Sequence, residues 1–302
     1  MTRILNLILN PQAAGGTARN RADKISSFFN QHGMEVNMHL TRQPRHAVEI
    51  ARQLAGSGEQ EIVSLGGDGT AFEVINGIMQ SGRNQDVRLG ILPLGTGNAF
   101  LKDFGLETWK ASAEKIIQGQ TRPVDAGACT MLNLPEQPVY YFYNLLGMGL
   151  FAEASSLRHQ IYYPLGKFAY IAAFFHLLVR LKHYPFRIRF EDGQERRVTT
   201  PLLAVCNSQF TGHRLHISPH SCTYDGKLEL LYSEDLSSWE LFQLFRVLST
   251  GKHLKHPKVY YQHFTQVEIQ VEQIESSNLD GEVVEGNHVK IEVAPSALQM
   301  YV

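Results

Sequence analysis

Residues 62–79 read IVSLGGDGTAFEVINGIM, and this stretch decides the fold. The short apolar run at 62–65 predicts a buried strand, and 71–79 predicts a helix. Between them lies the glycine loop GGDGT, residues 66–70. A strand, a glycine loop and a helix in this order indicate a parallel sheet that is covered by helices on both faces.

The same alternation continues on both sides of this stretch. We expect strands at 4–9, 34–40, 62–65 and 87–92, and helices at 17–31, 44–54 and 71–79. The first part of the chain is therefore predicted to be an open, mostly parallel α/β/α domain. Ligands of such sheets bind at the carboxyl ends of the strands.

After about residue 120 the pattern changes to short segments rich in aromatic and β-branched residues. We expect strands at 139–146, 186–190, 202–206, 228–232, 267–271 and 289–293. Helical patterns occur at 154–182, with Pro164 as a break, and at 237–248, which opens with the capping box Ser237-x-x-Glu240. The pairs at 192–193 and 286–287 predict hairpin turns. The second part is predicted to be a mainly antiparallel β domain, with the boundary near residues 120–125.

Composition excludes several classes of protein. The chain has 302 residues, of which 43% are hydrophobic and 19% charged, with a formal net charge of −1. This balance argues against a disordered protein and against a nucleic-acid binder, which usually has a basic excess. Three cysteines without C-x-x-C spacing exclude a disulfide framework and a thiolate zinc site. No secretory cleavage pattern follows the N-terminus, and no apolar run reaches the roughly 20 residues of a membrane span, so we expect a cytoplasmic protein.

Three glycine-rich loops follow three of the predicted strands. They are NPQAAGG at 10–16, GGDGT at 66–70 and LPLGTGN at 92–98. Glycine permits positive φ and a close approach of the backbone to a ligand, and successive N–H groups attract phosphate oxygens. Three such loops at one edge of a sheet predict a nucleotide site. The spacing is neither that of a P-loop nor that of a dinucleotide fingerprint.

Asp68 lies between glycines in the middle loop. A carboxylate there would repel phosphate unless a cation lay between them, and Mg²⁺ bridges such oxygens. The alternative is a structural Asp that caps a helix beginning at Thr70.

These motifs together resemble those of the diacylglycerol kinase catalytic-domain family, which includes bacterial-type lipid kinases and is related to sphingosine and ceramide kinases. The resemblance rests on the three loops, on DGKL at 225–228 and on LDGE at 279–282. It implies a nucleotide-binding α/β domain over 1–122, a β-sandwich lipid-acceptor domain over 123–302, and an active site in the cleft between them. Two positions depart from the family pattern, Phe72 and Ala99.

The activity implied by the resemblance is Mg²⁺-dependent transfer of the γ-phosphate of ATP to the hydroxyl of a lipid such as diacylglycerol. The cofactors expected are ATP and Mg²⁺, and the catalytic residues expected are Glu282, Asp280 and Asp68. The expected nucleotide-binding residues lie in the loops after the strands; they are Asn10, Thr41, Gly66, Gly67, Asp68, Gly69, Thr70, Gly95, Thr96 and Asn98. The resemblance also implies a structural magnesium near Asp225, with backbone carbonyls of Cys222 and Lys227.

Asp280 and Glu282 are two residues apart, so an extended 279–284 would place both side chains on one face. One carboxylate could accept the proton of the acceptor hydroxyl while the other orients it or holds magnesium. We favour Glu282 as the proton acceptor. The other interpretation is a plain turn, because Asp-Gly pairs are common in turns.

Two other segments have competing interpretations. The segment 212–220 contains three histidines, but without H-E-x-x-H or a cysteine pair we favour solvated or acceptor-site histidines over zinc. The aromatic-rich segment 161–179 is either a core-facing helix pair or an apolar lip for a lipid tail, with Phe168, Phe174 and Phe175 as membrane contacts.

The predicted partners are ATP, a lipid alcohol and, peripherally and reversibly, a membrane surface. No nucleic acid is expected, and a homodimer is left open. The alternative functions are a kinase of NAD, whose expected Asn-Glu pair is absent downstream of residue 70, and a nucleotide-sensing pseudokinase. The retained carboxylates Asp68, Asp280 and Glu282 argue against the pseudokinase.

Overall fold

The computed structural model describes residues 2–16, 18–95, 97–162, 165, 168–212, 215–272 and 276–302. The chain divides into two compact units. Unit 1 comprises Met1–Asp125 with Ser296–Val302, and unit 2 comprises Ala126–Pro295. Two strands cross the division, namely β5 (Arg122–Met131) and β18 (His288–Met300).

Unit 1 is built on a parallel sheet. Its strands lie in the order β2-β1-β3-β4 and are β1 (Arg3–Leu9), β2 (Met34–Leu40), β3 (Glu61–Gly66) and β4 (Arg88–Pro93). β3 and most of β1 and β4 are buried, which explains their continuous apolar runs. The predicted open parallel α/β/α arrangement is confirmed.

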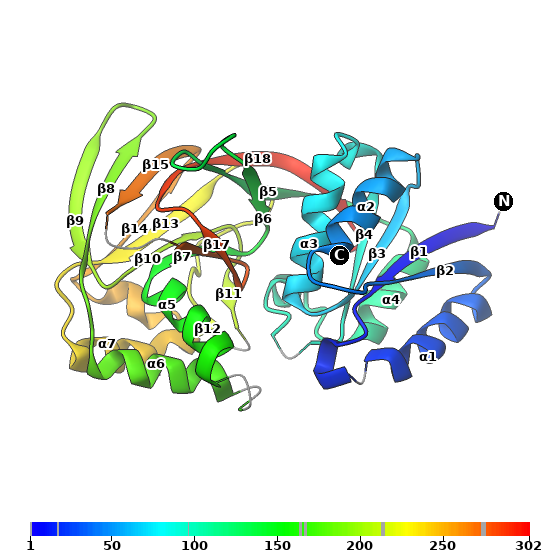
Figure 1. Ribbon diagram of the computed structural model, residues 1–302, viewed down its shortest axis with the longest axis horizontal. Helices are drawn as coiled ribbons and strands as arrows, with labels where there is room; N and C mark the ends of the chain where they lie inside the picture. The colour runs from blue at the N-terminus through cyan, green and yellow to red at the C-terminus, as the bar shows by residue number, and fades with distance from the viewer. Residues whose placement is uncertain are drawn as a thin grey trace. The chain divides into compact units, whose positions relative to one another are not determined.

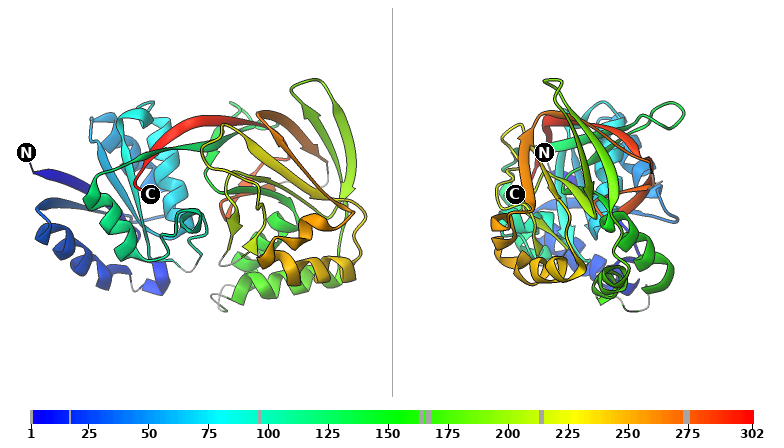
Figure 2. Two further views of the ribbon diagram at one scale, coloured as in Figure 1. Left: turned by 180° about the vertical axis from the view of Figure 1, so that it is seen from behind. Right: turned by 90° about the vertical axis from the view of Figure 1, so that its left-hand side faces the viewer.

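Helices cover both faces of this sheet (Figures 1 and 2). They are α1 (Ala18–Gln31), α2 (His46–Gly56), α3 (Asp68–Gln80) and α4 (Trp109–Gln118). On one face, Leu5 and Leu7 of β1 pack in a cluster with Ile25 of α1 and Ile116 of α4. On the other face α2 and α3 pack so closely that a Cβ on Gly77 would lie 2.3 Å from a backbone oxygen of α2.

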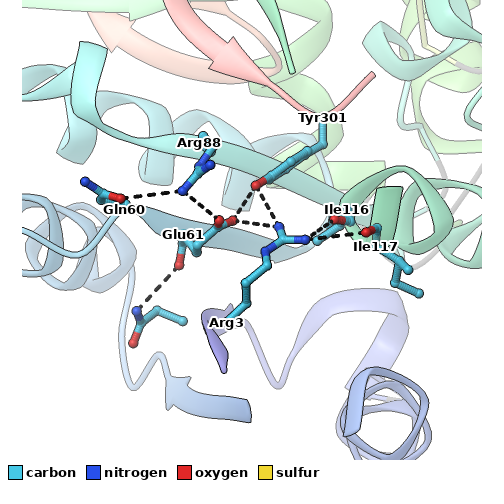
Figure 3. A network of polar contacts seen from close by, with 8 residues as sticks. Arg3, Gln60, Glu61, Arg88, Ile116, Ile117 and Tyr301 are labelled. Atoms are coloured by element: carbon cyan, nitrogen blue, oxygen red, sulfur yellow. Dashed lines mark hydrogen bonds and ion pairs between the residues drawn. The ribbon is translucent and has the colours of Figure 1, made fainter. Parts of the chain in front are cut away.

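The end of β18 completes the sheet of unit 1, because Gln299 and Met300 pair in parallel with Arg88 and Leu89 of β4. Tyr301, 2% exposed, follows directly and joins a polar network at the start of β1 and β3 (Figure 3). Its hydroxyl donates to the carboxylate of Glu61 and accepts from Arg3 at 2.8 Å. Burial raises the pKa of Tyr301, so the phenol stays neutral and can donate.

The C-terminal residues are thus part of unit 1. The predicted second domain comprised residues 123–302, whereas the contacts place the division after Asp125 and return Ser296–Val302 to unit 1. Strand periodicity identifies a strand but not its neighbour in the sheet.

Unit 2 contains two sheets with mostly antiparallel pairing. In the first, β18 pairs with β15 and β5, β15 with β8, β8 with β9, and β5 with β6. Its further strands are β6 (Val139–Phe142), β8 (Tyr184–Phe190), β9 (Glu195–Thr200) and β15 (Gln266–Val271). The second has six strands in the order β14-β13-β10-β7-β16-β17. These are β7 (Leu145–Gly149), β10 (Leu202–Cys206), β13 (Leu228–Ser233), β14 (Val259–Phe264), β16 (Ser276–Leu279) and β17 (Glu282–Glu285).

Burial differs between the two sheets. β8 alternates buried and exposed residues along its length, which is typical of a sheet with one face toward the core. β7 and β13 are buried throughout.

Three helices gather on this second sheet (Figure 1); they are α5 (Leu150–Leu157), α6 (Ala169–Val179) and α7 (Ser238–Val247). A small hairpin also belongs to unit 2, formed by β11 (Phe210–Thr211) and β12 (Leu215–His216). The predicted antiparallel second part is confirmed.

Some local predictions are confirmed and others differ from the structure. The capping box at Ser237 and the hairpin turn at 192–193, with Gly193 at φ 83°, are present. The hairpin predicted at 286–287 is wrong, because that turn leads from β17 in one sheet to β18 in the other. The helical segment 154–182 contains the end of α5, a π-helical turn (Arg158–Tyr162) and α6. Pro164, the predicted break, lies outside the described residues.

One strand of the second sheet of unit 2 carries a buried carboxylate. Glu229 of β13 is 0% exposed, accepts a hydrogen bond from the Ser218 hydroxyl, and has His263 3.5 Å from its Oε2. Burial raises the pKa of Glu229, while Ser218 and the charges of His263 and His220 oppose the rise. The neighbouring Cys206 thiol has a pKa well above its usual value, so it stays neutral.

We therefore expect Glu229→Gln to be more stable than the natural protein at pH 7. A raised folded-state pKa disfavours the carboxylate, so the proton-linked stability is complete below pH 4.5 and is lost as pH rises through the folded-state pKa. Melting temperatures between pH 4 and 8 should converge in acid and separate toward neutrality. Glu114→Gln, an exposed change on α4, is the control and should show no such separation. A less stable Glu229→Gln protein at pH 7 would contradict this account.

Candidate functional site

The expected nucleotide-binding residues gather at the carboxyl ends of the strands in unit 1. Asn10 follows β1, and its N–H donates to the Leu65 carbonyl of β3 at 3.2 Å. Thr41 follows β2, and its N–H donates to the Leu9 carbonyl of β1 at 2.9 Å. The GGDGT loop follows β3, and residues 94–98 follow β4. Thr96 lies outside the described residues.

The second and third loops contact each other through their backbones. The N–H groups of Leu94 and Gly95 both donate to the Gly66 carbonyl, at 2.8 and 3.2 Å. A Cβ on Gly95 would lie 2.7 Å from the Cα of Gly67, and one on Gly66 would lie 2.4 Å from the Thr70 hydroxyl. Neither Gly66 nor Gly95 has positive φ, so at these two positions glycine is required for close approach.

Asp68 joins these two loops. It is the first residue of α3, whose N-cap is Gly67, so it does not cap a helix that begins at Thr70. Its Oδ2 accepts the backbone N–H of Asn98 at 2.9 Å, and a Cβ on Gly97 would lie 2.3 Å from the same oxygen. The carboxylate is thus held over the third loop, partly open to solvent. A carboxylate among backbone groups at a helix N-terminus is a donor set that suits a Mg²⁺ ion carried by phosphates.

The two departures from the family pattern are buried. Phe72 is 7% exposed and Ala99 1% exposed, and both contribute to the core of unit 1. Because both positions are buried, neither departure changes the polar groups that the loops expose. Asn98 keeps its own role, because its side chain donates to the Gly95 carbonyl at 2.7 Å and its φ is 45°.

In unit 2, Asp280 and Gly281 form a two-residue hairpin between β16 and β17, with Leu279 opposite Glu282. Both loop residues have positive φ, 53° and 98°, as a type I′ turn requires. The expectation that an extended 279–284 places Asp280 and Glu282 on one face is therefore wrong. The chain reverses between them.

The Asp280 carboxylate is buried and bound to backbone. It is 7% exposed and accepts hydrogen bonds from three consecutive backbone N–H groups. The donors are Tyr143, Asn144 and Leu145, at 2.9, 3.0 and 2.8 Å. These contacts explain why the predicted strand 139–146 is divided into β6 and β7. The backbone between them turns its N–H groups toward the hairpin instead of a strand.

Glu282 is in a different environment. It is the first residue of β17 and is half-buried. Among the described residues, its carboxylate has no hydrogen-bond or ion-pair partner. Of the two carboxylates in this motif, Glu282 is the one whose oxygens remain available to a substrate.

The third expected site, at 222–227, is an exposed turn. The Asp225 Oδ1 accepts the backbone N–H of Lys227 at 3.1 Å, Gly226 has φ 70°, and Cys222 is half-buried. Throughout the described residues there is no group of three or more His, Cys, Asp or Glu side chains that could hold a metal ion. A cation here would depend on one carboxylate and backbone carbonyls, and its presence stays a prediction.

The histidines of 212–220 have ordinary packing partners where they are described. His216 stacks on Phe210 with ring centroids 4.5 Å apart, and His220 lies 5.1 Å from the ring of Tyr261. Burial lowers the pKa of His216. His213 lies outside the described residues.

A side-chain network that the sequence did not predict lies beside the hairpin. Asn278 accepts the backbone N–H of Gly281 at 3.1 Å and donates to the hydroxyl of Ser155 on α5. That hydroxyl lies 3.3 Å from the hydroxyl of Tyr170 on α6, to which Arg158 donates at 3.2 Å. In the sequence, the only indication of this network was that Asn278 lies two residues before Asp280.

Two family models match the chain. The diacylglycerol kinase catalytic domain matches residues 5–129, and the YegS C-terminal NAD kinase beta sandwich-like domain matches residues 144–302. A diacylglycerol kinase from Staphylococcus epidermidis is 30% identical over 285 residues, covering 93% of this chain and 86% of that protein. One from Bacillus subtilis is 26% identical over 279 residues, covering 91% and 88%.

Solved structures share the fold. A Bacillus anthracis protein, provisionally assigned as a diacylglycerol kinase, superposes with a TM-score of 0.81 at 22% identity, covering 99% of this chain and 94% of that one. Yeast NADH kinase complexed with NADH superposes with a TM-score of 0.51 at 13% identity, covering 99% and 82%. At these identities the superpositions show a common architecture alone.

Proposed function

The chain belongs to the diacylglycerol kinase family, and from this premise we propose that it transfers the γ-phosphate of ATP to the hydroxyl of a lipid. The observation that carries the proposal is the pair of chemically distinct carboxylates. Asp68 joins two phosphate-type loops in unit 1, and Glu282 has available oxygens at the hairpin of unit 2. A kinase needs a site for the nucleotide phosphates and a base for the acceptor hydroxyl.

The residues of unit 1 would bind the nucleotide. Backbone N–H groups of the glycine loops suit phosphate oxygens, and their tight packing fixes the positions of these donors before substrate arrives. Asp68 would hold Mg²⁺, which neutralises charge on the phosphates when it is bound. Asn10 and Thr41 lie at the same edge and would contact the nucleotide from the first two strands.

The residues of unit 2 would act on the acceptor. Glu282 would accept the proton of the lipid hydroxyl as the new P–O bond forms. Asp280 would position Glu282, because its three backbone hydrogen bonds fix the hairpin to the start of β7. We assign Asp280 to positioning and not to proton transfer.

The direct test is an assay of the purified protein with labelled ATP, Mg²⁺ and a panel of acceptors. The panel should include diacylglycerol, monoacylglycerol, phosphatidylglycerol, a sphingoid base, a polyprenol and NAD(H). Label in a lipid would support the proposal, and label only in NAD(H) would favour the pyridine-nucleotide alternative that the shared architecture with yeast NADH kinase suggests. Absence of label from every acceptor would favour the pseudokinase.

We also propose that α6 and α7 rest on the surface of a membrane. No helix in the described part of the chain is long and apolar enough to cross one. Ile171, Phe175 and Val179 are 44%, 42% and 85% exposed, and together with Phe168 their spacing places them on one side of α6. Trp239, at the start of α7, is 63% exposed. Such a surface, with exposed Lys182 beside it, is typical of peripheral binding to lipid.

We expect Phe175→Ser to weaken sedimentation with phosphatidylglycerol-containing vesicles. Because Phe175 also contacts the rings of Phe242 and Phe245 of α7, the melting temperature should fall, but by less than in Phe174→Ser. Phe174 differs from the expectation drawn from the sequence. It is 8% exposed and stacks on Phe245 with centroids 4.3 Å apart, so Phe174→Ser should instead destabilise the protein by about 3 kcal/mol or more. Equal sedimentation of the natural protein and a folded Phe175→Ser variant would contradict the membrane proposal.

A further inference from the structure

Arg158 is placed beside the hairpin that carries Glu282. It donates to the Tyr170 hydroxyl at 3.2 Å, and its guanidinium lies 4.7 Å from the centre of the Tyr170 ring. The same hydroxyl lies 3.5 Å from the position that a Cβ on Gly281 would occupy. Through Ser155 and Asn278, the network joins Arg158 to the hairpin backbone. The guanidinium is therefore oriented by Tyr170, which is itself connected to the hairpin.

The charge of Arg158 is not neutralised within the described residues, where no carboxylate lies within ion-pair distance of it. Glu153, on the preceding helix α5, is engaged elsewhere: it binds Lys182 at 3.1 Å and the Tyr184 hydroxyl at 2.6 Å. A half-buried guanidinium has five N–H donors in a planar fork, and the phenol takes one of them. The remaining donors suit a bidentate anion, and phosphate oxygens match that geometry.

The surroundings of Arg158 favour a lipid-borne anion. Ile161 and Phe168, which follow it along the chain, are 54% and 58% exposed, and Ile171 is 44% exposed. A cation that is stacked on an aromatic ring at the edge of an apolar surface is well suited to a phosphate group attached to acyl chains.

We infer that Arg158 binds a phosphate oxyanion of the reactants next to Glu282. This inference rests on the proposed function, and two sources share the chemistry. One is the phosphodiester of an anionic acceptor lipid, which the apolar surroundings favour. The other is the phosphoryl group under transfer.

The test uses Arg158→Met, which keeps the hydrophobic volume over Tyr170 and removes the charge. Short-chain acceptors, dihexanoylglycerol and dihexanoylphosphatidylglycerol, separate acceptor recognition from binding to a bilayer. If the acceptor supplies the anion, KM for dihexanoylphosphatidylglycerol rises about 10- to 100-fold, while the KM values for dihexanoylglycerol and ATP stay unchanged. If the transferred phosphoryl group supplies it, kcat falls by a similar factor with both acceptors.

Two further variants sharpen the result. Arg158→Lys keeps the charge without the fork and should recover part of the loss. Arg52→Met, an exposed change on α2, controls for the overall charge and should behave like the natural protein. Unchanged kinetics with both acceptors in a folded Arg158→Met protein would overturn the inference.

Binding of dihexanoylphosphatidylglycerol, followed by calorimetry without ATP, separates this inference from the proposed function. If the natural protein phosphorylates no lipid, the proposed function fails. Arg158-dependent binding would still support the anion site, and binding that does not depend on Arg158 would overturn it.

Discussion

Glu282→Gln is expected to lose phosphoryl transfer by a factor of about 10² to 10⁴ while the protein keeps its fold and its affinity for ATP. A lipid hydroxyl has a pKa far above neutrality, so it must give up its proton as the new bond forms. The Glu282 carboxylate is half-buried and has no partner among the described residues, so an amide of the same shape removes the base and disturbs no contact. The readouts are kcat, the melting temperature and ATP binding by calorimetry.

Asp280→Asn is the matched variant, with a different expected profile. An Asn side chain offers one acceptor oxygen and an NH₂ group where the carboxylate now receives three N–H donors. At least one buried N–H would lose its partner, at a cost of about 1–3 kcal/mol. Activity and melting temperature should therefore fall together in Asp280→Asn, whereas only activity falls in Glu282→Gln. Near-normal turnover of Glu282→Gln would mean that the base lies elsewhere, and Asp280 would be the first candidate.

Asp68→Asn should abolish transfer nearly as completely as Asp68→Ala. The Asn variant retains an oxygen that can accept the Asn98 N–H, so the second and third loops stay joined while the charge is lost. The Ala variant loses both the charge and the contact. If the charge holds Mg²⁺ and the phosphates, both variants are inactive and bind MgATP weakly, and Asn98 remains in place only in Asp68→Asn.

The comparison of the two Asp68 variants distinguishes chemistry from loop structure. Full turnover of Asp68→Asn with an inactive Asp68→Ala would show that Asp68 only fixes the third loop. Full turnover of both would remove Asp68 from the site. Thermal unfolding of each variant checks that inactivity does not arise from a misfolded unit 1.

Much of the fold could be predicted because β1, β3 and β4 of unit 1 are largely buried and read as apolar runs. Which strands pair with one another could not be predicted in this way. Gln299 and Met300 look like the end of any strand, and only the neighbouring β4 shows that they belong to unit 1. The turn at 286–287 has the composition of a hairpin, yet it connects two sheets. Local turn chemistry specifies a reversal of the chain but not the partner of the next strand.

The candidate site shows a similar limit. The glycine loops were identifiable because each follows a strand, and the structure brings the described members to one edge of the sheet. The different environments of Asp280 and Glu282 could not be predicted, because Asp280 is fixed by backbone donors more than 130 positions away. Phe174 and Phe175 are adjacent in sequence, but the rotation of α6 buries one and exposes the other. Arg158 and Tyr170 meet only because the π-helical turn after α5 packs against α6.

The return of the last residues to unit 1 bears on how the protein is made. When the ribosome has completed Met1–Asp125, β4 has no partner on one side, because Ser296–Val302 do not yet exist. At roughly 5–20 residues per second, translation of Ala126–Pro295 leaves that edge open for roughly 10 to 30 seconds. During this interval an unpaired strand edge is a site for mispairing or for a chaperone. Unit 1 is thus begun before Ala126–Pro295 is synthesised and completed only after it.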